Sequence, residues 1–528
     1  MTTEFTRLKE VSPLFNLLGE KISGDIDCSY ETLSKNSRDN SSSRIWPRAV
    51  IYPKTTTDIK EVISFSLEYK IPIAVRGNGT CESGGSLTEG IQLDMTRYFD
   101  KIKNIEVFNN SVTLEAGVVA KDLQAKLNSW ELEIPIINET NANKSIGGML
   151  ANKEISSTSL MNGSIREWVE SITIILDNGE EHKIEDGITP SGRLLEIYEK
   201  IFPLISKNEE SIRISKPQTI FNTSGYDLWG HSIGPRKLID LIIGSQGTLG
   251  IITSVKLRTT PKKKLYTNIA CTIPSYELVS VIVDIFNHHK AEKVFCFDET
   301  VFKLSQKYKG YLTEKLITTE ETVITIIGTI SANNETNLKH KEKLLFAALP
   351  VYDNNKKLLD GYENENYNLI ASSAKELLEK YGNNKLIPLM LNDDIIIPTS
   401  SLSNFLEELN NLISKRGIIY TLTGNIGYGQ ISVIPLININ ASNTEDSVFF
   451  MAKEIFTLVK KYKGSISGTK NDGICRTPFL NLMYNMQIVE IFKEVKNIFD
   501  PSFVFNPGKK TTLDLNYFKQ SINRGSVS

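Results

Sequence analysis

Apolar and polar positions near the start of the chain follow two periods, one typical of helices and one typical of strands. Capping residues at 55–58 precede apolar side chains at helical spacing over 59–67. The β-branched run 71–75 and the alternating run 90–95 are predicted to be strands, and the segment between them is rich in glycine. This order predicts an α/β unit in which a glycine-rich loop connects two strands.

The glycine-rich loop has the sequence RGNGTCESGG, from Arg76 to Gly85. Glycine adopts positive φ angles and has no Cβ, so several backbone N–H groups can face one concavity and bind a phosphate. The loop lacks the lysine of a P-loop and the third glycine of a Rossmann fingerprint, and a strand rather than a helix is predicted after it. On this stretch alone, a phosphate cradle and an ordinary glycine-rich hairpin are equally supported.

Three further patterns follow before residue 262. A predicted strand at 111–116 and a predicted helix at 118–130 lead into a loop that contains SIGG at 145–148, where paired glycines suit either close approach to a ligand or a plain turn. The run 170–176 followed by Asp-Asn-Gly is typical of a β-hairpin. A third glycine-rich turn, at 244–250, opens into another strand.

The second half of the chain has fewer glycine-rich loops and alternates helices with strands, which predicts a separate α+β domain. Its predicted helices are 278–289, 338–349 and 401–415, and its predicted strands are 293–297, 323–330, 418–422 and 430–436. A helix at 488–499 then precedes the turn-rich tail FDPSFVFNPGKK. Residues 1–45 are a predicted lead-in, with an amphipathic helix near 8–22 and a polar, flexible linker at 34–44.

Composition narrows the function classes. A chain of 528 residues is expected to form two or three domains. The 60 Lys and Arg residues against 62 Asp and Glu residues leave a net charge of -2 without a basic block, which predicts no nucleic-acid partner.

The chain starts without an apolar signal core and has no run of 18 apolar residues, so a cytoplasmic protein without a transmembrane segment is expected, with peripheral membrane association left open. Five scattered cysteines without a CxxC pair predict reduced thiols.

Four motifs in one order are more specific than any of them alone. They are RGNGTCESGG, SIGG followed by Ala151-Asn152, GSQGTLGIIT and the terminal FDPSFVFNPGK. Together they resemble the FAD-linked oxidases of the vanillyl-alcohol oxidase type, with a PCMH-type FAD domain, close to the D-lactate, glycolate and D-2-hydroxyglutarate dehydrogenase branch. The resemblance covers residues 44 to 510.

The resemblance implies an α+β fold, in which a two-part α/β FAD-binding domain is covered by an α+β cap over the flavin. The implied FAD-binding domain is 46–261, the cap or substrate domain is 262–465, and the C-terminal segment 466–528 returns to the FAD domain. The glycine loop would bind the FAD pyrophosphate through backbone N–H groups. The FAD is expected to be non-covalent, because Asn78 and Thr80 stand where some relatives have a histidine bonded to the flavin.

The residues implied to bind FAD lie in the four motifs and in the loop before the second. They are Arg76, Gly77, Asn78, Gly79, Thr80, Cys81, Ser83, Gly84, Pro135, Ser145, Gly147, Gly148, Asn152, Gly247, Gly250, Ile252 and Asn506. Of these, Asn506 would reach the flavin ring from the tail.

The substrate side departs from the same family. Relatives in the 2-hydroxy-acid branch carry segments resembling GHxGDGNxH and GEHG, but this chain has GNIGYGQIS at 424–432 and GTKN at 468–471. Tyr428 replaces the aspartate of the first segment, and Lys470 replaces the histidine of the second. The chain's histidines match none of the family positions, and no metal site is predicted; they are His182, His231, His288, His289 and His340.

The sequence also lacks a clear carboxylate clamp. No arginine occurs between Arg258 and Arg416, and Asn392 stands where a family lysine is expected. Because a planar two-point grip on a carboxylate is typically made by arginine, a 2-hydroxy-acid substrate is not favoured.

Four residues remain as candidates for the chemistry. Tyr428 is a candidate acid or base if its pKa is lowered, against a packed aromatic residue with a satisfied hydroxyl. Lys470 is a candidate catalytic positive charge, against a solvated surface lysine. Asn425 and Arg476 are candidate substrate contacts, and Arg476 could instead lie on the surface of the flavin domain.

Three functional hypotheses follow. The first is an FAD-dependent oxidoreductase that oxidises a CH–OH group of a small molecule by hydride transfer to flavin N5, with an unidentified electron acceptor. The second is a flavin-binding protein without dehydrogenase turnover, acting as a scaffold or electron-transfer partner. The third is a D-lactate-type dehydrogenase with a rewritten active site.

Overall fold

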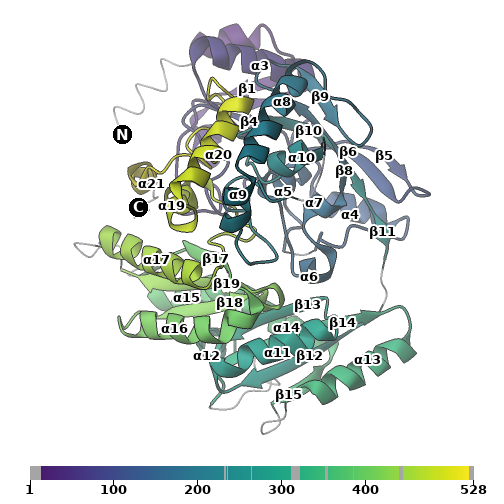
Figure 1. The fold of residues 1–528 in the computed structure, drawn as a ribbon, viewed down its shortest axis with the longest axis vertical. Coiled ribbons are helices and arrows are strands. Elements are labelled where there is room, and N and C mark those ends of the chain that lie inside the picture. The colour runs from purple at the N-terminus through teal and green to yellow at the C-terminus, as the bar shows by residue number, and fades with distance from the viewer. Residues whose placement is uncertain are drawn as a thin grey trace.

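The computed structural model describes residues 13–138, 140–230, 234, 236–262, 265–310, 321–350, 355–383, 386–438 and 444–521. Figure 1 shows two lobes. One lobe contains both the N-terminal part and the C-terminal helices, and the other is formed by the segment from β12 to α17. The predicted α+β fold, in which a second α+β domain covers a two-part first domain, is confirmed.

The first sheet has the strand order β1-β2-β4-β3. Its elements are β1 (Asp25–Asp27), α2 (Tyr30–Asn36), β2 (Ala49–Tyr52), α3 (Thr56–Tyr69), β3 (Ile73–Arg76) and β4 (Ile91–Asp94). A capping box between Thr55 and Asp58 begins α3, as the sequence predicts. Strands β3 and β4 pair in parallel, so the glycine-rich loop between them is a crossover connection. This register excludes the hairpin alternative.

The linker at 34–44 is ordered and lies beside the first sheet. The prediction that it is flexible is therefore wrong. The Asn40 N–H donates to the Cys81 carbonyl at 2.9 Å, and the Arg76 guanidinium donates to the Arg38 carbonyl at 2.8 Å. The linker is ordered because its carbonyl groups accept hydrogen bonds from an arginine that is buried behind the glycine loop. Of the predicted helix at 8–22, residues 13–19 are helical and residues 8–12 lie outside the described residues.

The second sheet of this lobe is antiparallel, in the order β5-β6-β10-β8-β9, and a two-stranded sheet, β7-β11, lies beside it. The strands are β5 (Ile102–Glu106), β6 (Ser111–Glu115), β7 (Leu132–Glu133), β8 (Val169–Ile175), β9 (Glu181–Ile184), β10 (Ile251–Arg258) and β11 (Thr260–Pro261). The helices are α4 (Ala120–Asn128), α5 (Ile146–Asn152), α6 (Ser159–Asn162), α7 (Ile165–Trp168), α8 (Gly192–Lys207), α9 (Glu209–Ser215) and α10 (Arg236–Ile242). The SIGG motif, predicted as a loop, instead begins α5, because the Ser145 hydroxyl accepts the Gly148 N–H and caps the helix.

The cap is built on a large antiparallel sheet in the order β15-β12-β14-β13-β18-β19-β16, with β17 paired to β19. Its strands are β12 (Leu265–Ile273), β13 (Lys293–Asp298), β14 (Ile324–Ala332), β15 (Lys356–Leu359), β16 (Ile387–Pro388), β17 (Asn392–Ile396), β18 (Tyr420–Gly424) and β19 (Gln430–Ile437). Its helices are α11 (Val279–His288), α12 (Glu299–Tyr308), α13 (Glu335–Ala348), α14 (Gly361–Ser372), α15 (Ala374–Gly382), α16 (Leu402–Ser414) and α17 (Thr444–Lys461), with short 3-10 turns η1 (Tyr276–Leu278), η3 (Thr399–Ser401) and η4 (Ile426–Tyr428).

Both faces of the cap sheet are buried. Alternate residues of β12 show this, since Ile269 and Cys271 belong to one hydrophobic cluster with α11 and α16, and Ala270 belongs to another with α12 and α15. Such strands carry continuous apolar runs rather than alternating ones, and every residue of β14 is buried.

The C-terminal segment packs against the first lobe again. It contains α18 (Gly473–Arg476), η5 (Thr477–Phe479), α19 (Leu480–Met483), α20 (Met486–Phe499) and α21 (Leu515–Ser521). Past α20, Phe505 bridges to Ile73 of β3, and the Asn506 N–H donates to the Ile73 carbonyl at 2.7 Å. The tail therefore fixes the strand from which the glycine loop departs.

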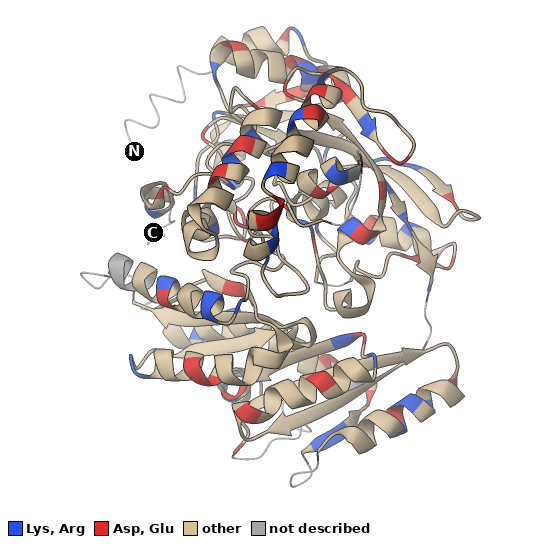
Figure 2. Ribbon diagram, in the orientation of Figure 1, with Lys and Arg blue, Asp and Glu red and all other residues tan. Residues whose placement is uncertain are grey.

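A buried lysine connects this tail to the rest of the lobe. Lys496 pairs with Asp500 and also donates to the carbonyl oxygens of Thr248 and Phe505, at 2.7 and 2.6 Å. Elsewhere charges of both signs are interspersed over both lobes (Figure 2). Among the helices that the structure describes, none is long and apolar enough to cross a membrane.

Replacing Lys496 by methionine is predicted to destabilise the first lobe by about 3–5 kcal/mol, because the Asp500 carboxylate stays buried without its partner. The control is Lys493→Met on the same helix, whose partner Glu490 is exposed and whose loss is predicted to cost less than about 1 kcal/mol. Urea unfolding followed by circular dichroism measures both, and equal effects of the two substitutions would contradict the assignment.

Candidate functional site

Three glycine-rich segments enclose a cavity in the first lobe. Its volume is about 860 Å³, counted with the space at its open side. It is lined by Val75, Arg76, Gly77, Asn78, Gly79, Thr80, Cys81, Gly85, Ser86, Met95, Ala116, Lys144, Ser145, Gly147, Gly148, Ala151, Asn152, Ile242, Ser245, Gln246, Gly247, Gly250 and Ile252. Most of the residues implied to bind FAD are therefore brought together around one space, and the exceptions are Ser83, Gly84, Pro135 and Asn506.

Two glycines of the first loop are required by close contacts. A Cβ on Gly77 would lie 2.0 Å from the Ser145 hydroxyl oxygen, and a Cβ on Gly79 would lie 2.1 Å from a guanidinium nitrogen of Arg76. Gly79 also has a φ of +69°, which disfavours any residue with a side chain. The loop thus passes directly between the start of α5 and the buried Arg76.

The backbone N–H groups of residues 77–82 donate to no protein acceptor in the described part of the chain. The loop is nevertheless fixed, because the Asn78 side chain donates to the Asn143 carbonyl at 2.6 Å. A fixed run of N–H groups without protein acceptors, beside glycines that a Cβ would displace, is a donor set that fits the diphosphate of FAD.

The residues behind the cavity form its floor. The Gln246 amide donates to Ser83 and Asn152 at 3.3 Å each and accepts the Gly473 N–H at 2.8 Å. The buried Asn506 amide donates to the carbonyl oxygens of Gly85 and Gln246, both at 2.7 Å. Asn506, expected from the resemblance to reach the ring, lies in this second layer, as does Ser83.

Gly84 and Pro135 also lie outside the lining. Gly84 has a φ of +76° and faces Ile474 of α18, and the Pro135 carbonyl accepts a hydrogen bond from Thr158 at 2.7 Å. Both hold neighbouring segments in place rather than facing the cavity.

Two ionisable groups with shifted pKa values behind the loop are not apparent from the sequence. Burial lowers the pKa of Lys509 to about 7, and its ammonium group donates to the Leu87 carbonyl at 2.6 Å. Burial of the carboxyl group raises the pKa of Asp39 to about 6. The charged residues of the linker and of the NPGKK tail were the available signals, but neither segment shows a period that predicts burial.

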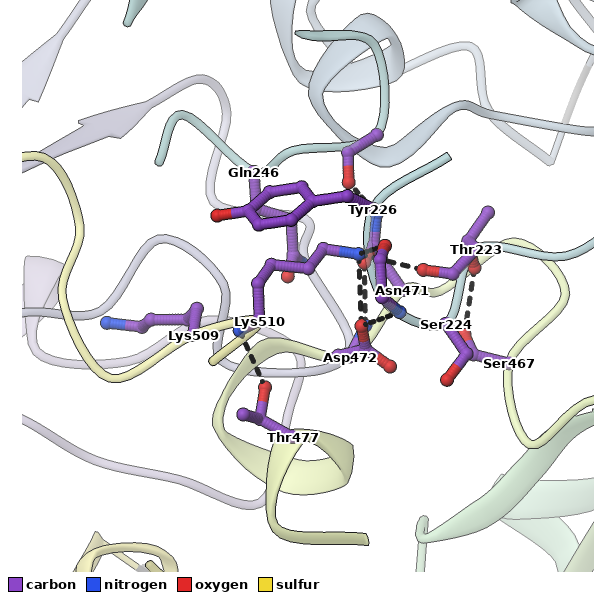
Figure 3. A network of polar contacts seen from close by, with 12 residues as sticks. Thr223, Ser224, Tyr226, Gln246, Ser467, Asn471, Asp472, Thr477, Lys509 and Lys510 are labelled. Atoms are coloured by element: carbon purple, nitrogen blue, oxygen red, sulfur yellow. Dashed lines mark hydrogen bonds and ion pairs between the residues drawn. The ribbon is translucent and has the colours of Figure 1, made fainter. Parts of the chain in front are cut away.

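A network of polar contacts joins the segment 467–477 to Thr223 and to the tail residue Lys510 (Figure 3). Lys510 pairs with Asp472 at 3.0 Å and donates to the Thr223 carbonyl at 2.8 Å, and the Thr223 and Ser467 hydroxyls are 3.0 Å apart. The tail and the cap-side segment are thus joined to the first lobe at the edge of the cavity floor.

A β-bulge in β17 aims two acidic side chains at this segment. The register of β17 against β19 shifts between Asn392 and Ile395. Neighbouring strand residues normally point to opposite faces, and a bulge can re-aim one of them. Here Asp393 and Asp394 both contact residues of 467–476.

Asp394 holds the backbone of this segment. Its carboxylate accepts the N–H groups of Gly468, Thr469 and Lys470, at 2.9, 3.0 and 2.7 Å, and the Ser467 hydroxyl at 2.9 Å. Burial raises the pKa of Asp394, while these donors and the nearby cations oppose the rise.

Asp393 joins the two cationic candidates. One of its oxygens accepts from Lys470 at 2.7 Å, and the other accepts from Arg476. Burial alone would raise the pKa of Asp393, but the two cations lower it below its ordinary value. Burial would lower the pKa of Lys470, but Asp393 and Glu82 raise it, so Lys470 is held as a cation.

The surface alternatives for Lys470 and Arg476 do not apply. The Lys470 side chain is 16% exposed and also pairs with Glu82 of the glycine loop at 3.2 Å. The Arg476 side chain is fully buried in α18 and donates to the Asn471 carbonyl at 2.9 Å. Lys144, which lines the cavity, pairs with the buried Glu154 at 2.7 Å.

Tyr428 is packed rather than poised for proton transfer. Its hydroxyl donates to the Ser156 carbonyl at 3.1 Å, and its ring meets Phe221 edge-on at 5.2 Å. Burial, with Asp394 and Glu154 nearby, raises the pKa of Tyr428 well above its ordinary value. The lowered pKa on which an acid–base role depends is therefore not provided. Asn425, whose N–H donates to the Gln430 side chain at 2.9 Å, precedes Tyr428 in the same turn.

The histidines are dispersed. His182 pairs with Glu180 at 2.9 Å, the rings of His288 and His289 are 5.5 Å apart, and His231 lies outside the described residues. Within the described ranges, no group of three or more His, Cys, Asp and Glu residues is placed to hold a metal ion.

Two family models match the chain. The first, described as FAD binding domain, covers residues 47–185. The second, described as FAD linked oxidases, C-terminal domain, covers residues 264–510. The first match contains the glycine loop and the start of α5, and the second contains Asp393, Lys470 and Arg476.

Relatives match over most of the chain. The chain is 24% identical to the D-2-hydroxyglutarate dehydrogenase of Pantoea ananatis over 94% of this chain and 51% of that protein, so it spans about half the length of that relative. It is also 24% identical to a D-lactate dehydrogenase of Archaeoglobus fulgidus, over 89% of this chain and 94% of the relative. A solved structure of 4-ethylphenol oxidase from Gulosibacter chungangensis has the same fold, with a TM-score of 0.67, 14% identity and coverage of 98% of this chain and 99% of that one.

Replacing Gly79 by alanine is predicted to weaken FAD binding at least about tenfold, the effect of losing one charge-assisted hydrogen bond, because the Cβ displaces the loop from Arg76. Gly187→Ala is the matched control, since Gly187 also has a positive φ, of +80°, but no atom lies within 4 Å of its Cβ position. FAD affinity is measured by equilibrium dialysis and folding by thermal melts. Equal loss of affinity in both variants would contradict the assignment of the cradle.

The low pKa of Lys509 predicts a pH-dependent stability. Above about pH 7 the unfolded chain binds a proton that folded Lys509 does not, so stability gains about 1.4 kcal/mol per pH unit from this group as the pH rises. Lys509→Met should remove that gain between about pH 7 and pH 9, and Lys493→Met should keep it. The pKa of Asp39 lies below this window. Urea unfolding at several pH values tests this, and identical slopes for wild type and Lys509→Met would refute it.

Proposed function

Because this chain belongs to the FAD-linked oxidase family, we propose that it is an FAD-dependent oxidoreductase that oxidises a CH–OH group of a small molecule. The observation that carries the proposal is the cavity lined by residues 77–81 of the glycine loop and closed behind by Gln246 and Asn506. When bound, FAD supplies the acceptor for a hydride from the substrate carbon.

In this proposal the backbone N–H groups of the glycine loop hold the FAD diphosphate, and Ser145, Gly147 and Gly148 allow the cofactor to approach the start of α5. Close packing of Gly147 supports the latter role, because a Cβ there would lie 2.8 Å from the Ala116 carbonyl oxygen. Asn78 and Thr80 stand in place of the histidine that bonds to the flavin in some relatives, which supports non-covalent binding.

Lys470 acts as a fixed positive charge beside the cradle rather than as a proton carrier. Its ion pairs with Asp393 and Glu82 support this role, since both raise its pKa. Tyr428 stays protonated and packs against Phe221. Asn425 is a substrate contact in this proposal, and Arg476 acts through Asp393 rather than by direct contact.

The substrate is proposed to carry no carboxylate next to the reacting carbon. Three cations at the site already have acidic partners, since Lys144 pairs with Glu154, and Lys470 and Arg476 pair with Asp393. A substrate carboxylate would have to displace a buried ion pair, which is costly. This distinguishes the proposed substrate from the acids in the names of the dehydrogenase relatives.

A second candidate is a flavin-binding protein without turnover. The high pKa of Tyr428 and the neutralised cations favour it, because they remove the two groups that the sequence offered for proton transfer and carboxylate binding.

Anaerobic titration of the FAD-loaded protein with an uncharged alcohol, with D-lactate and with dithionite distinguishes the candidate functions. We expect a yellow protein whose FAD is released by denaturation and whose flavin is bleached by an uncharged alcohol but not by D-lactate. Bleaching by dithionite alone would support the second candidate, bleaching by D-lactate would support a lactate-type dehydrogenase, and protein that cannot be loaded with FAD would refute the proposed cofactor role.

A further inference from the structure

We propose that Asp393 is a built-in carboxylate that occupies a carboxylate-binding pair formed by Lys470 and Arg476 and thereby excludes acidic substrates. The inference rests on the proposed function for its meaning as substrate specificity. The arrangement of the three side chains stands independently of turnover.

The contacts of Asp393 are those expected of a clamped substrate acid. Its two oxygens are divided between two cations, one taken by Lys470 at 2.7 Å and the other by Arg476. Asp393 and Arg476 are both fully buried, so water does not screen the interaction. An arginine and a lysine that share one carboxylate form a small anion site whose ligand belongs to the chain itself.

The backbone of β17 positions this carboxylate. The register shift in β17 lets Asp393 and Asp394 both reach the segment 467–476, and Asp394 binds the backbone N–H groups of 468–470. The segment that carries Lys470 is thereby fixed against the strand that carries Asp393. The tethered carboxylate has a high effective concentration between the cations, so a free acid competes with it poorly.

The site lies against the cofactor cavity. Lys470 reaches Glu82 of the glycine loop at 3.2 Å, and the Asn471 side chain donates to the Gly244 carbonyl at 2.8 Å, next to Ser245 and Gln246 of the cavity lining. A ligand carboxylate held by this pair would therefore stand at the edge of the FAD site, where the substrate must lie.

The pair formed by Lys470 and Arg476 also has a hydrogen-bond donor that Asp393 does not use. The Nε of Arg476 is buried and has no hydrogen-bond partner among the described residues, because one terminal nitrogen binds Asp393 and the other binds the Asn471 carbonyl. A free carboxylate can take a two-point position on a guanidinium that the tethered Asp393 does not use. Removing the charge of Asp393 should therefore create an anion site rather than only destroy an ion pair.

The test compares wild type with Asp393→Ala by thermal melts and isothermal titration in sodium formate, with sodium chloride at the same ionic strength as reference. Formate is the probe because it is the size of the carboxylate group that the substitution removes. The expected result is that formate stabilises Asp393→Ala and binds to it about 10- to 100-fold more tightly than to wild type, the range of one charge-assisted hydrogen bond.

Two variants provide matched controls. Glu82→Ala removes a carboxylate beside the same lysine but leaves Asp393 in place, so its formate affinity should equal that of wild type. The double variant Asp393→Ala/Arg476→Gln removes one charge of each sign and leaves Lys470 with Glu82, so it should fold without formate and bind it no better than wild type. Formate binding by the double variant as tight as by the single variant would contradict the role of Arg476.

Other outcomes also decide the matter. If Asp393→Ala is recovered folded only in formate, that dependence is the same positive result. If it folds without binding formate, or is not rescued by formate, the proposal is wrong, and formate binding to wild type as tight as to Asp393→Ala would overturn it as well. Because these measurements need no turnover, their failure is distinguishable from failure of the proposed oxidoreductase activity.

Discussion

Backbone N–H groups that have no acceptor among the described residues must still be held in place, and this constraint organises the first lobe. If residues 77–82 formed a helix or a β-ladder, hydrogen bonds within the protein would occupy the N–H groups that fit a diphosphate. Other segments therefore hold the loop from outside. The linker carbonyls bind Arg76, the start of α5 abuts Gly77, and the tail residue Asn506 binds the carbonyls of Gly85 and Gln246.

The same constraint explains why distant parts of the chain converge. Lys496 joins the third glycine-rich turn to the tail, and Lys510 joins the tail to Asp472 beside the cap. Each of these lysines is buried with a carboxylate, an arrangement that is costly to form and more costly to break on one side. These two ion pairs fix which segments meet at the cavity floor. They also couple the position of the cap to the position of the glycine loop.

Much of this could be predicted from the sequence, because local signals sufficed. The capping box before α3, the Asp-Asn-Gly hairpin after β8 and the glycine loops lie where the patterns predict them. The failures have different causes. The linker was expected to be flexible because the side chain that orders it, Arg76, is distant in sequence. SIGG was expected to be a loop although its cap is local, since the Ser145 hydroxyl accepts the Gly148 N–H. The pairing of Asp393 with Lys470 and Arg476 depends on a bulge, which no sequence period reveals.

The N–H groups of residues 77–82 are proposed to receive the cofactor. Amide hydrogen exchange of the chain with and without FAD, resolved to peptides of the glycine loop, tests this role. Fast exchange over 77–82 is expected without FAD, and strong protection is expected when FAD is bound, with little change in β14, which is buried in the cap sheet. Saturating FAD that leaves exchange over 77–82 unchanged, while protecting another segment, would show that the cofactor binds elsewhere.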